Sequence, residues 1–370
     1  MKLVDWSLHF YRIPYDRVVV WANATEDAGI FALLRVVADT GLVGIAEGTI
    51  KATWSGASPR TIAAALEDLF IPTLRSIDVG DPAAVAAAFS GVPENRLARQ
   101  LIDNACWGLR AIAADKPLWQ LWEGERSVEL TWAVTRQAPA VMAAEAADIC
   151  ARFGFRTLKV KGGQGVDIDL RALSEIRSAV GPTVELYVDA NSAYSRAEAL
   201  AYVKRIAAFG VTLAEDPCPL VPDAAFEALQ AASPLPILVD STCTSVRDAA
   251  VYLDRGARAL MTKPGRIGFS ESRAIGALAA VRGAKVAVGL YAESALGTLI
   301  SAQLAASIPV DQRIATAEQT FFLIMRDQVV TRPPMIRDGR LSLPVSAGLD
   351  DLVDWDRIKH LAVHTVEGRP

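Results

Sequence analysis

The feature that most constrains this chain is a regular alternation of short apolar runs with amphipathic helical stretches. Eight runs typical of buried β-strands begin at Val128, Thr157, Val184, Val211, Pro236, Ala259, Lys285 and Ile314. From Thr157 onward the starts are separated by 27, 27, 25, 23, 26 and 29 residues. This rhythm predicts parallel strand–helix–strand units, and eight strands suit a closed barrel better than an open sheet. A doubly wound sheet is the alternative, although no GxGxxG motif follows the first run.

The flanking segments have a different pattern. Before the alternation, extended runs surround a turn signal at Asp39-Thr40-Gly41, and helical periodicity begins at Ser58. After it, short extended pieces alternate with Pro and Gly turns. We therefore predict an α+β domain over residues 1–125, a barrel over 126–320, and a segment over 321–370 that returns to the first domain.

Composition excludes several classes of protein. The formal net charge is −4, without basic blocks, which gives no support for nucleic-acid binding. The four cysteines form no CxxC pair or metal-like cluster, so we expect reduced cysteines in a cytoplasmic protein. No signal-peptide pattern opens the chain and no run of 18 apolar residues occurs, so we expect no membrane partner.

Charged side chains stand at the ends of five consecutive predicted strands, where barrel enzymes place their chemistry. They are Lys159 and Lys161 on the second strand, Asp189 on the third, Glu215 on the fourth, Asp240 on the fifth and Lys263 on the sixth. One such acid is commonly a helix cap or a loop residue. Three carboxylates at matching positions would repel one another unless a cation neutralised them, and a hard divalent ion such as Mg²⁺ fits oxygen ligands.

The lysines flank the three acids. Lys159 and Lys161 are two residues apart in a strand, so both are predicted to face the barrel interior. Their mutual repulsion and an adjacent cation favour a neutral amine that could act as a base. Lys263 would approach from the opposite side. Two lysines beside a metal-bound carboxylate suit proton transfer at the neighbouring carbon, with the metal as Lewis acid.

Taken together, these motifs resemble the muconate-lactonizing branch of the enolase superfamily, in the mandelate racemase/muconate lactonizing enzyme family. The resemblance covers nearly the whole chain, including IDNACWGLRAIAADKPLWQLW, ESALGTLISAQLA and PPMIRDGRLSLPVSAGL. It implies a modified (β/α)₇β barrel, similar to a TIM barrel, with an α+β capping domain built from both termini. It implies Mg²⁺, with Mn²⁺ as a substitute, held by Asp189, Glu215 and Asp240. It further implies Lys161 as the principal acid/base, Lys263 as its counterpart and Lys159 as a tuning residue.

The resemblance also implies a small-molecule carboxylate substrate and a homo-oligomer, either a dimer or an octamer. Among reactions it favours isomerisation, as in muconate cycloisomerases or racemases and epimerases. The alternative within the family is a lyase, resembling o-succinylbenzoate synthase or an acid-sugar dehydratase. The predicted barrel contains no histidine, unlike the mandelate-racemase branch, and its last strand lacks the Asp-x-Asp of dipeptide epimerases. From other classes, a Schiff-base aldolase using Lys263 and a non-catalytic barrel are the rival interpretations.

Substrate contacts are predicted mainly from the first domain. The segments Trp21–Ala28 and Lys51–Ser58 are expected to form a lid, with Trp54 beside Gly56 over an organic acid. A Trp54 packed within its own domain is the alternative. Lys51 is a candidate for a distal carboxylate. The remaining substrate-binding candidates are Asn191 and Glu293. Two departures from the branch, Asp216 and Ser241 beside predicted metal ligands, alter the surroundings of those ligands.

Overall fold

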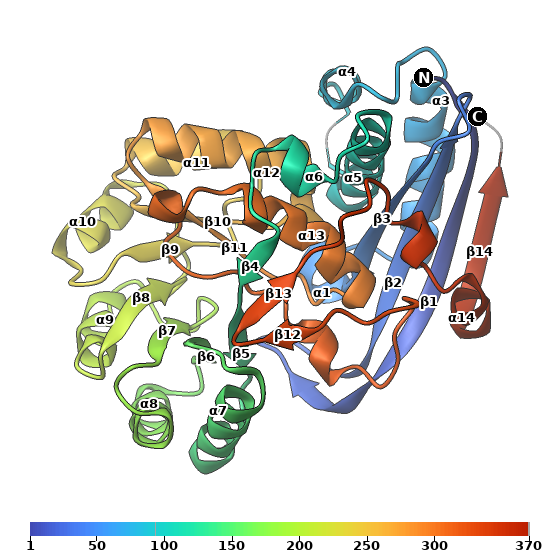
Figure 1. The fold of residues 1–370 in the computed structure, drawn as a ribbon. Helices are drawn as coiled ribbons and strands as arrows, with labels where there is room; N and C mark the ends of the chain where they lie inside the picture. The colour runs from blue at the N-terminus through green and yellow to red at the C-terminus, as the bar shows by residue number, and fades with distance from the viewer. Residues whose placement is uncertain (93, 369–370) are drawn as a thin grey trace.

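The computed structural model describes residues 1–92 and 94–368, and its larger part is a sheet of seven parallel strands curled inside a layer of helices (Figure 1). The strands follow one another in chain order: β5 (Thr131–Val134), β6 (Thr157–Lys161), β7 (Glu185–Asp189), β8 (Val211–Glu215), β9 (Ile237–Val239), β10 (Ala259–Thr262) and β11 (Lys285–Val288). The helices that alternate with them are α7 (Pro139–Phe153), α8 (Val166–Val180), α9 (Ala199–Ala207), α10 (Ala224–Ala232), α11 (Val246–Asp254), α12 (Pro264–Val281) and α13 (Ala295–Ser307). The alternation predicted from the sequence is confirmed.

The barrel closes without an eighth regular strand. Residues 313–318 lie between the two edge strands and form only isolated bridges, Val286 with Arg313 and Leu130 with Ala317. The amide of Glu318 donates to the carbonyl of Val288 at 3.0 Å, and the amide of Thr131 donates to Ala317 at 2.7 Å. The first predicted strand is also divided. Its beginning, β4 (Ser127–Glu129), pairs with the C-terminal segment, and its end, β5, belongs to the barrel.

An antiparallel sheet with its own helices covers one end of the barrel and forms the cap. The sheet order is β14 (Ala362–Gly368), β1 (Leu3–Val20), β2 (Thr25–Ala38) and β3 (Val43–Ile50). Gly41, at the predicted turn between β2 and β3, has φ of 81°, a conformation glycine adopts without steric cost. The cap and interdomain helices are α1 (Ala52–Ser55), α2 (Pro59–Ala65), a π-helical turn (Leu66–Phe70), α3 (Ile71–Leu74), α4 (Pro82–Ala88), α5 (Arg96–Ala113) and α6 (Leu118–Leu121).

The C-terminal segment touches both parts of the molecule. The hairpin of β12 (Ile336–Arg337) and β13 (Arg340–Ser342) pairs with β4 at the start of the barrel. After α14 (Trp355–Leu361), β14 pairs antiparallel with β1 of the cap. Figure 1 shows β14 in red beside the blue β1, so segments from the two ends of the sequence build one sheet.

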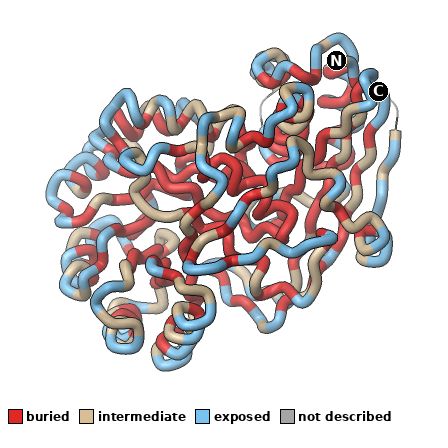
Figure 2. The backbone as a smooth tube through the Cα atoms, in the orientation of Figure 1, coloured by how far each residue is buried: buried red, intermediate tan, exposed pale blue. Residues whose placement is uncertain are grey.

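Buried residues follow this architecture (Figure 2). One apolar cluster fills the space between the cap sheet and its helices, and another lies between the barrel strands and the outer helices. Inside the barrel a small plug contains Tyr187, Leu213, Leu238, Met261 and Ala287. Charged side chains are buried above this plug, at the strand ends that face the cap. Among the described residues, no helix is long and apolar enough to cross a bilayer.

Candidate active site

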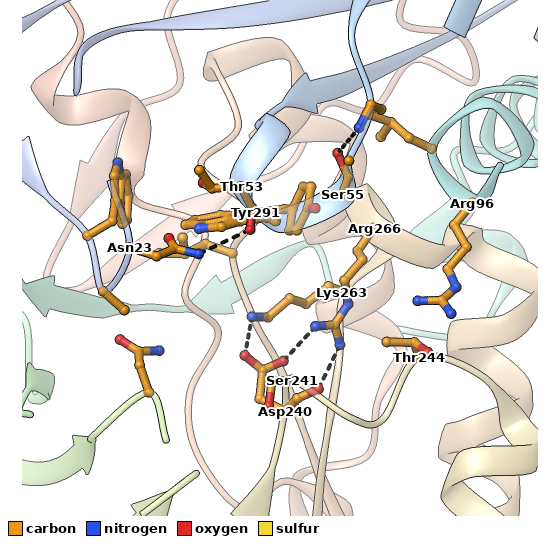
Figure 3. A pocket seen from close by; sticks show the side chains of 18 of the residues that line it. Asn23, Thr53, Ser55, Arg96, Asp240, Ser241, Thr244, Lys263, Arg266 and Tyr291 are labelled. Carbon is orange, nitrogen blue, oxygen red and sulfur yellow. Dashed lines mark hydrogen bonds and ion pairs between the residues drawn. The ribbon is translucent and has the colours of Figure 1, made fainter. Parts of the chain in front are cut away.

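A cavity of about 620 Å³ lies between the C-terminal ends of the barrel strands and the cap (Figure 3). The barrel contributes its predicted lysines, Lys159, Lys161 and Lys263, together with Asp240 and Asn191. The cap contributes two loops, after β1 and after β3, and the first turn of α5. Parallel strands place all their C-terminal ends at one edge, so residues far apart in the sequence meet here.

Lys159 is the centre of a buried charge cluster. Its side chain is 1% exposed, and its Nζ lies 2.8 Å from Glu215, 2.9 Å from Glu318 and 3.1 Å from Asp189. Burial lowers the pKa of the Lys159 amine, but the three carboxylates outweigh burial and hold it above its ordinary value. Lys159 therefore neutralises charge among the acids in this structure.

Lys161, two residues further along β6, lines the cavity. Its Nζ donates to Oδ2 of Asp189 at 2.6 Å, and its side chain is 15% exposed. Asn191 supports the same carboxylate through its backbone amide at 2.8 Å and its side-chain amide at 3.1 Å. Burial raises the pKa of Asp189, but the Lys159 and Lys161 ammoniums outweigh burial and hold it well below the usual range.

Asp240 is held by cations from the far side of the cavity. Lys263, which immediately follows β10, donates from Nζ to Oδ2 of Asp240 at 2.5 Å, and Arg266 lies 3.1 Å from Oδ1. Figure 3 shows these three side chains converging. Asp216 holds the loop that follows β9 in place, because its carboxylate accepts hydrogen bonds from the amides of Asp240 and Ser241 at 3.1 and 2.8 Å. Burial and the charge of Asp240 raise the pKa of Asp216 to about 6.

The three predicted metal ligands stand on adjacent strand ends, and Asp189 is the register partner of Glu215. Their carboxylate oxygens do not converge on one point as the ligands of a bound ion would. Within residues 1–92 and 94–368, no group of three or more acidic, histidine or cysteine side chains is arranged to hold a metal ion. Ammonium groups lie against these carboxylates instead. Oε2 of Glu215 and Oδ1 of Asp240 accept no hydrogen bond, although each lies near a cation.

This donor set fits Mg²⁺ in its chemistry. Three carboxylates offer hard oxygen ligands, and two of them keep an oxygen free of hydrogen bonds.

Aromatic side chains form the cap side of the cavity. The ring of Trp54 lies 4.9 Å from that of Trp21 and 5.2 Å from that of Tyr291, both edge to face. Asn23 donates to the carbonyl of Thr53 at 3.1 Å and so joins the two predicted lid loops. Trp54 thus packs against Trp21 of its own cap and also lines the cavity, and its contact with a substrate stays a prediction.

Lys51 lies outside the cavity lining, contrary to the role we expected for it. Its ammonium forms an ion pair with Glu26 and lies over the rings of Trp21 and Trp54 at 4.5 and 5.0 Å. Burial lowers the pKa of the Lys51 amine, and Glu26 opposes this effect. Lys51 joins the two predicted lid loops, and its pairing with Glu26 gives no support for a contact with a substrate carboxylate.

Glu293 is also absent from the residues that line the cavity and lies buried behind them. It is 2% exposed and accepts from the amide of Tyr291 at 2.7 Å. Nearby, Glu47 of the cap accepts from the amide and hydroxyl of Ser294, at the start of α13. Burial raises the pKa of Glu293 to about 7 and also raises that of Glu47. Glu47 thus joins the cap to the barrel beside the site, whereas Glu293, among the described residues, accepts hydrogen bonds only from Tyr291 and Ser301 of the barrel.

Several residues of the site were missed in the sequence, among them Arg266, Tyr291, Glu318 and Arg96. Glu318 lies in the segment predicted as the eighth strand, where nothing distinguished it from an ordinary strand residue, yet it contacts Lys159 and accepts from Tyr187 at 2.7 Å. Arg96 belongs to a helix of the cap, far in sequence from every strand end. Only an inspection of the charged residues at helix starts in the cap could have raised it.

Comparison with known proteins identifies the family. Residues 12–122 match the mandelate racemase/muconate lactonizing enzyme N-terminal domain, and residues 141–356 match the enolase C-terminal domain-like model. The chain belongs to the enolase superfamily. Within it, the chain is related to the muconate-lactonizing branch, and its relatives are enzymes.

Relatives of several activities resemble it to a similar degree. A muconate cycloisomerase 1-2 of Acinetobacter lwoffii is 27% identical over 365 residues, covering 96% of this chain and 94% of the relative. An o-succinylbenzoate synthase of Geobacillus kaustophilus is 28% identical over 323 residues, covering 85% and 80%. A muconate lactonizing enzyme from Mucobacterium smegmatis, complexed with muconolactone, superposes with a TM-score of 0.93 at 26% identity, covering 98% of this chain and 100% of that one.

A dipeptide epimerase from Cytophaga hutchinsonii, crystallised with Mg and a dipeptide, shares the fold at 21% identity with a TM-score of 0.90, covering 99% and 100%. Members of the superfamily use Mg²⁺. The confirmed fold is the barrel with a capping domain that the resemblance implied.

Proposed function

We propose that this protein is a Mg²⁺-dependent isomerase that moves a proton at the carbon next to a substrate carboxylate. The observation that supports this most directly is that Lys161, Lys263 and Asp240 line one cavity from different strand ends. Asp189 and Glu215 are buried behind the lining, where both contact Lys159. A substrate carbon between the two lysines would be within reach of an acid/base group on each face. Family membership is consistent with this chemistry but extends equally to cycloisomerases, epimerases and synthases.

In this proposal Asp189, Glu215 and Asp240 hold Mg²⁺. Bound Mg²⁺ supplies positive charge that makes a proton next to a carboxylate easier to remove. Lys161 takes that proton through Nζ, and Asp189 and Asn191 fix the direction of the amine. Lys263 Nζ, oriented by Asp240, either returns a proton to the other face of that carbon or stabilises the negative charge that develops there. Lys159 remains behind them and balances the charge of the acids.

Aromatic side chains limit the access of water to one side of the cavity. Trp54 and Trp21 of the cap pack with Tyr291 of the barrel there, which strengthens charge interactions among the lysines and acids nearby. Glu318 gives Lys159 a carboxylate partner that is not one of the three proposed ligands.

The test is proton exchange in D₂O, followed by NMR, with muconates, N-acylamino acids and proline betaines as candidate substrates. Once a substrate is found, Lys161→Ala is expected to lower turnover by roughly 10²–10⁴-fold, the range for loss of a general acid or base. Lys285→Ala is the matched control, because Lys285 is exposed at the opposite end of its barrel strand.

Removal of Mg²⁺ with EDTA should abolish the exchange, and added Mg²⁺ should restore it. A Lys161→Ala protein with undiminished turnover would refute the assignment. Covalent trapping of substrate on Lys263 by borohydride, with activity unaffected by EDTA, would instead support the Schiff-base alternative.

A further inference from the structure

The basic residues that line the cavity differ in one respect. Four have buried carboxylate partners within 3.1 Å: Lys159, Lys161, Lys263 and Arg266. The fifth, Arg96, has none. In the part of the chain that the structure describes, the side chain of Arg96 makes no hydrogen bond, and its one ion pair is with Glu94 at 3.9 Å. Arg96 is therefore the cation of the cavity whose charge is least compensated.

The fold places Arg96 at the wall of the cavity rather than on an unrelated surface. The first three residues of α5, 96–98, line the cavity together with Glu94 and Asn95, which precede the helix. Glu94 and Asn95 before it have left-handed φ values of 63° and 52°, which turn the chain into the helix at this point. Figure 3 shows Arg96 at the right of the view, above Thr244, with Asn23 at the left.

The ion pair with Glu94 does not occupy Arg96. Both side chains are largely exposed, at 51% and 78%, and an exposed pair at this distance contributes little free energy. A guanidinium presents a planar set of donors that matches a carboxylate, so an anionic group of a ligand would form shorter and stronger hydrogen bonds with it. Lys51, the other cap cation near the cavity, is already paired with Glu26 and enclosed by aromatic rings.

We propose that Arg96 binds a second anionic group of the substrate, so that the enzyme selects dianionic carboxylic acids over acids with one carboxylate. This inference rests on the proposed function, because that function places the first carboxylate at the barrel floor. The second carboxylate then lies under the cap, against the start of α5. Arg96 acts as a specificity-determining residue and takes no part in proton transfer.

The test is isothermal titration calorimetry of the Mg²⁺-loaded protein with two matched series of ligands. One series is the straight-chain dicarboxylates from succinate to suberate, and the other is the monocarboxylates of the same carbon number. In the wild type, at least one dicarboxylate is expected to bind roughly tenfold tighter than its monocarboxylate, the effect of one charge-assisted hydrogen-bonded contact. In Arg96→Gln this advantage should disappear, while the monocarboxylate affinities stay the same.

Arg110→Gln is the control, because Arg110 is an exposed arginine in the last turn of the same helix and lies outside the cavity. It should retain the full dicarboxylate advantage. Absence of any advantage in the wild type, or its persistence in Arg96→Gln, overturns the proposal. Monocarboxylate binding that requires Mg²⁺ tests the proposed function separately, so loss of the Arg96 effect alone leaves that function standing.

Discussion

Replacing Lys159 by methionine tests whether this lysine is the charge that holds the metal-free site together. Lys159 is 1% exposed and its ammonium lies within 3.1 Å of Asp189, Glu215 and Glu318. Lys159→Met leaves these buried carboxylates without their shared partner. Removing one partner of a buried ion pair costs about 3–5 kcal/mol, so the free energy of unfolding in EDTA should fall by about that amount.

Mg²⁺ should reverse much of this loss. A ligand present at 100 times its Kd stabilises the folded state by about 2.7 kcal/mol, and Lys159→Met removes a cation that competes for the same carboxylates. The variant should therefore gain more stability from Mg²⁺ than the wild type does. Lowering the pH should also narrow the deficit, because burial already raises the pKa of Glu215 and a proton can replace the lost charge.

The assay is urea unfolding followed by tryptophan fluorescence, in EDTA and in excess Mg²⁺. Lys285→Met is the control, since that lysine is exposed at the other end of the barrel and its loss should change stability by less than about 0.5 kcal/mol. If Lys159→Met in EDTA is as stable as the wild type, Lys159 does not neutralise the acids and the charge account of the site is wrong.

Two further predictions concern the buried acids Glu293 and Glu47 beside the site. Burial raises the pKa of Glu293 from 4.5 to about 7. Between these two pH values the Glu293 carboxyl is protonated in the folded protein but ionised in the unfolded chain. Wild-type stability should therefore fall relative to Glu293→Gln as pH rises through this window, by about 3 kcal/mol in total, and parallel unfolding curves at pH 5 and 8 would contradict this. Gly297→Ala places a methyl group 2.3 Å from Oε1 of Glu47 and 2.8 Å from Cβ of Glu293, and should destabilise by about 1–3 kcal/mol in the same assay. Gly276→Ala, whose new methyl group meets nothing within 4 Å, should show no such loss.

The spacing of strands and helices in the sequence predicted the barrel, because parallel strands joined by helices can form only a few folds. In each of these folds the C-terminal ends of the strands lie at one edge. The positions of Lys161, Asp189 and Lys263 at one edge follow from strand register alone. Closure by an irregular segment could not be predicted, since residues 313–318 have the apolar pattern of a strand but bond to their neighbours only at isolated points.

Contacts between cap and barrel were harder to predict. Lys51 had the right charge and a location beside the predicted lid, but its partners Glu26 and Trp21 come from another loop of the cap sheet. Arg96 was overlooked because a basic residue at a helix start has no pattern that points to a site. In both cases the deciding information is which loop lies next to which, and periodicity does not contain it.

The pairing of β14 with β1 has a consequence for the order of folding. Trp6 is the register partner of Gly368, so the cap sheet gains its outer strand only after the entire barrel sequence has been synthesised. Closing so long a loop is entropically costly and slow, and a barrel that has already formed brings the two segments close together. During synthesis the edge of β1 therefore stays without this partner until residues 362–368 have been made.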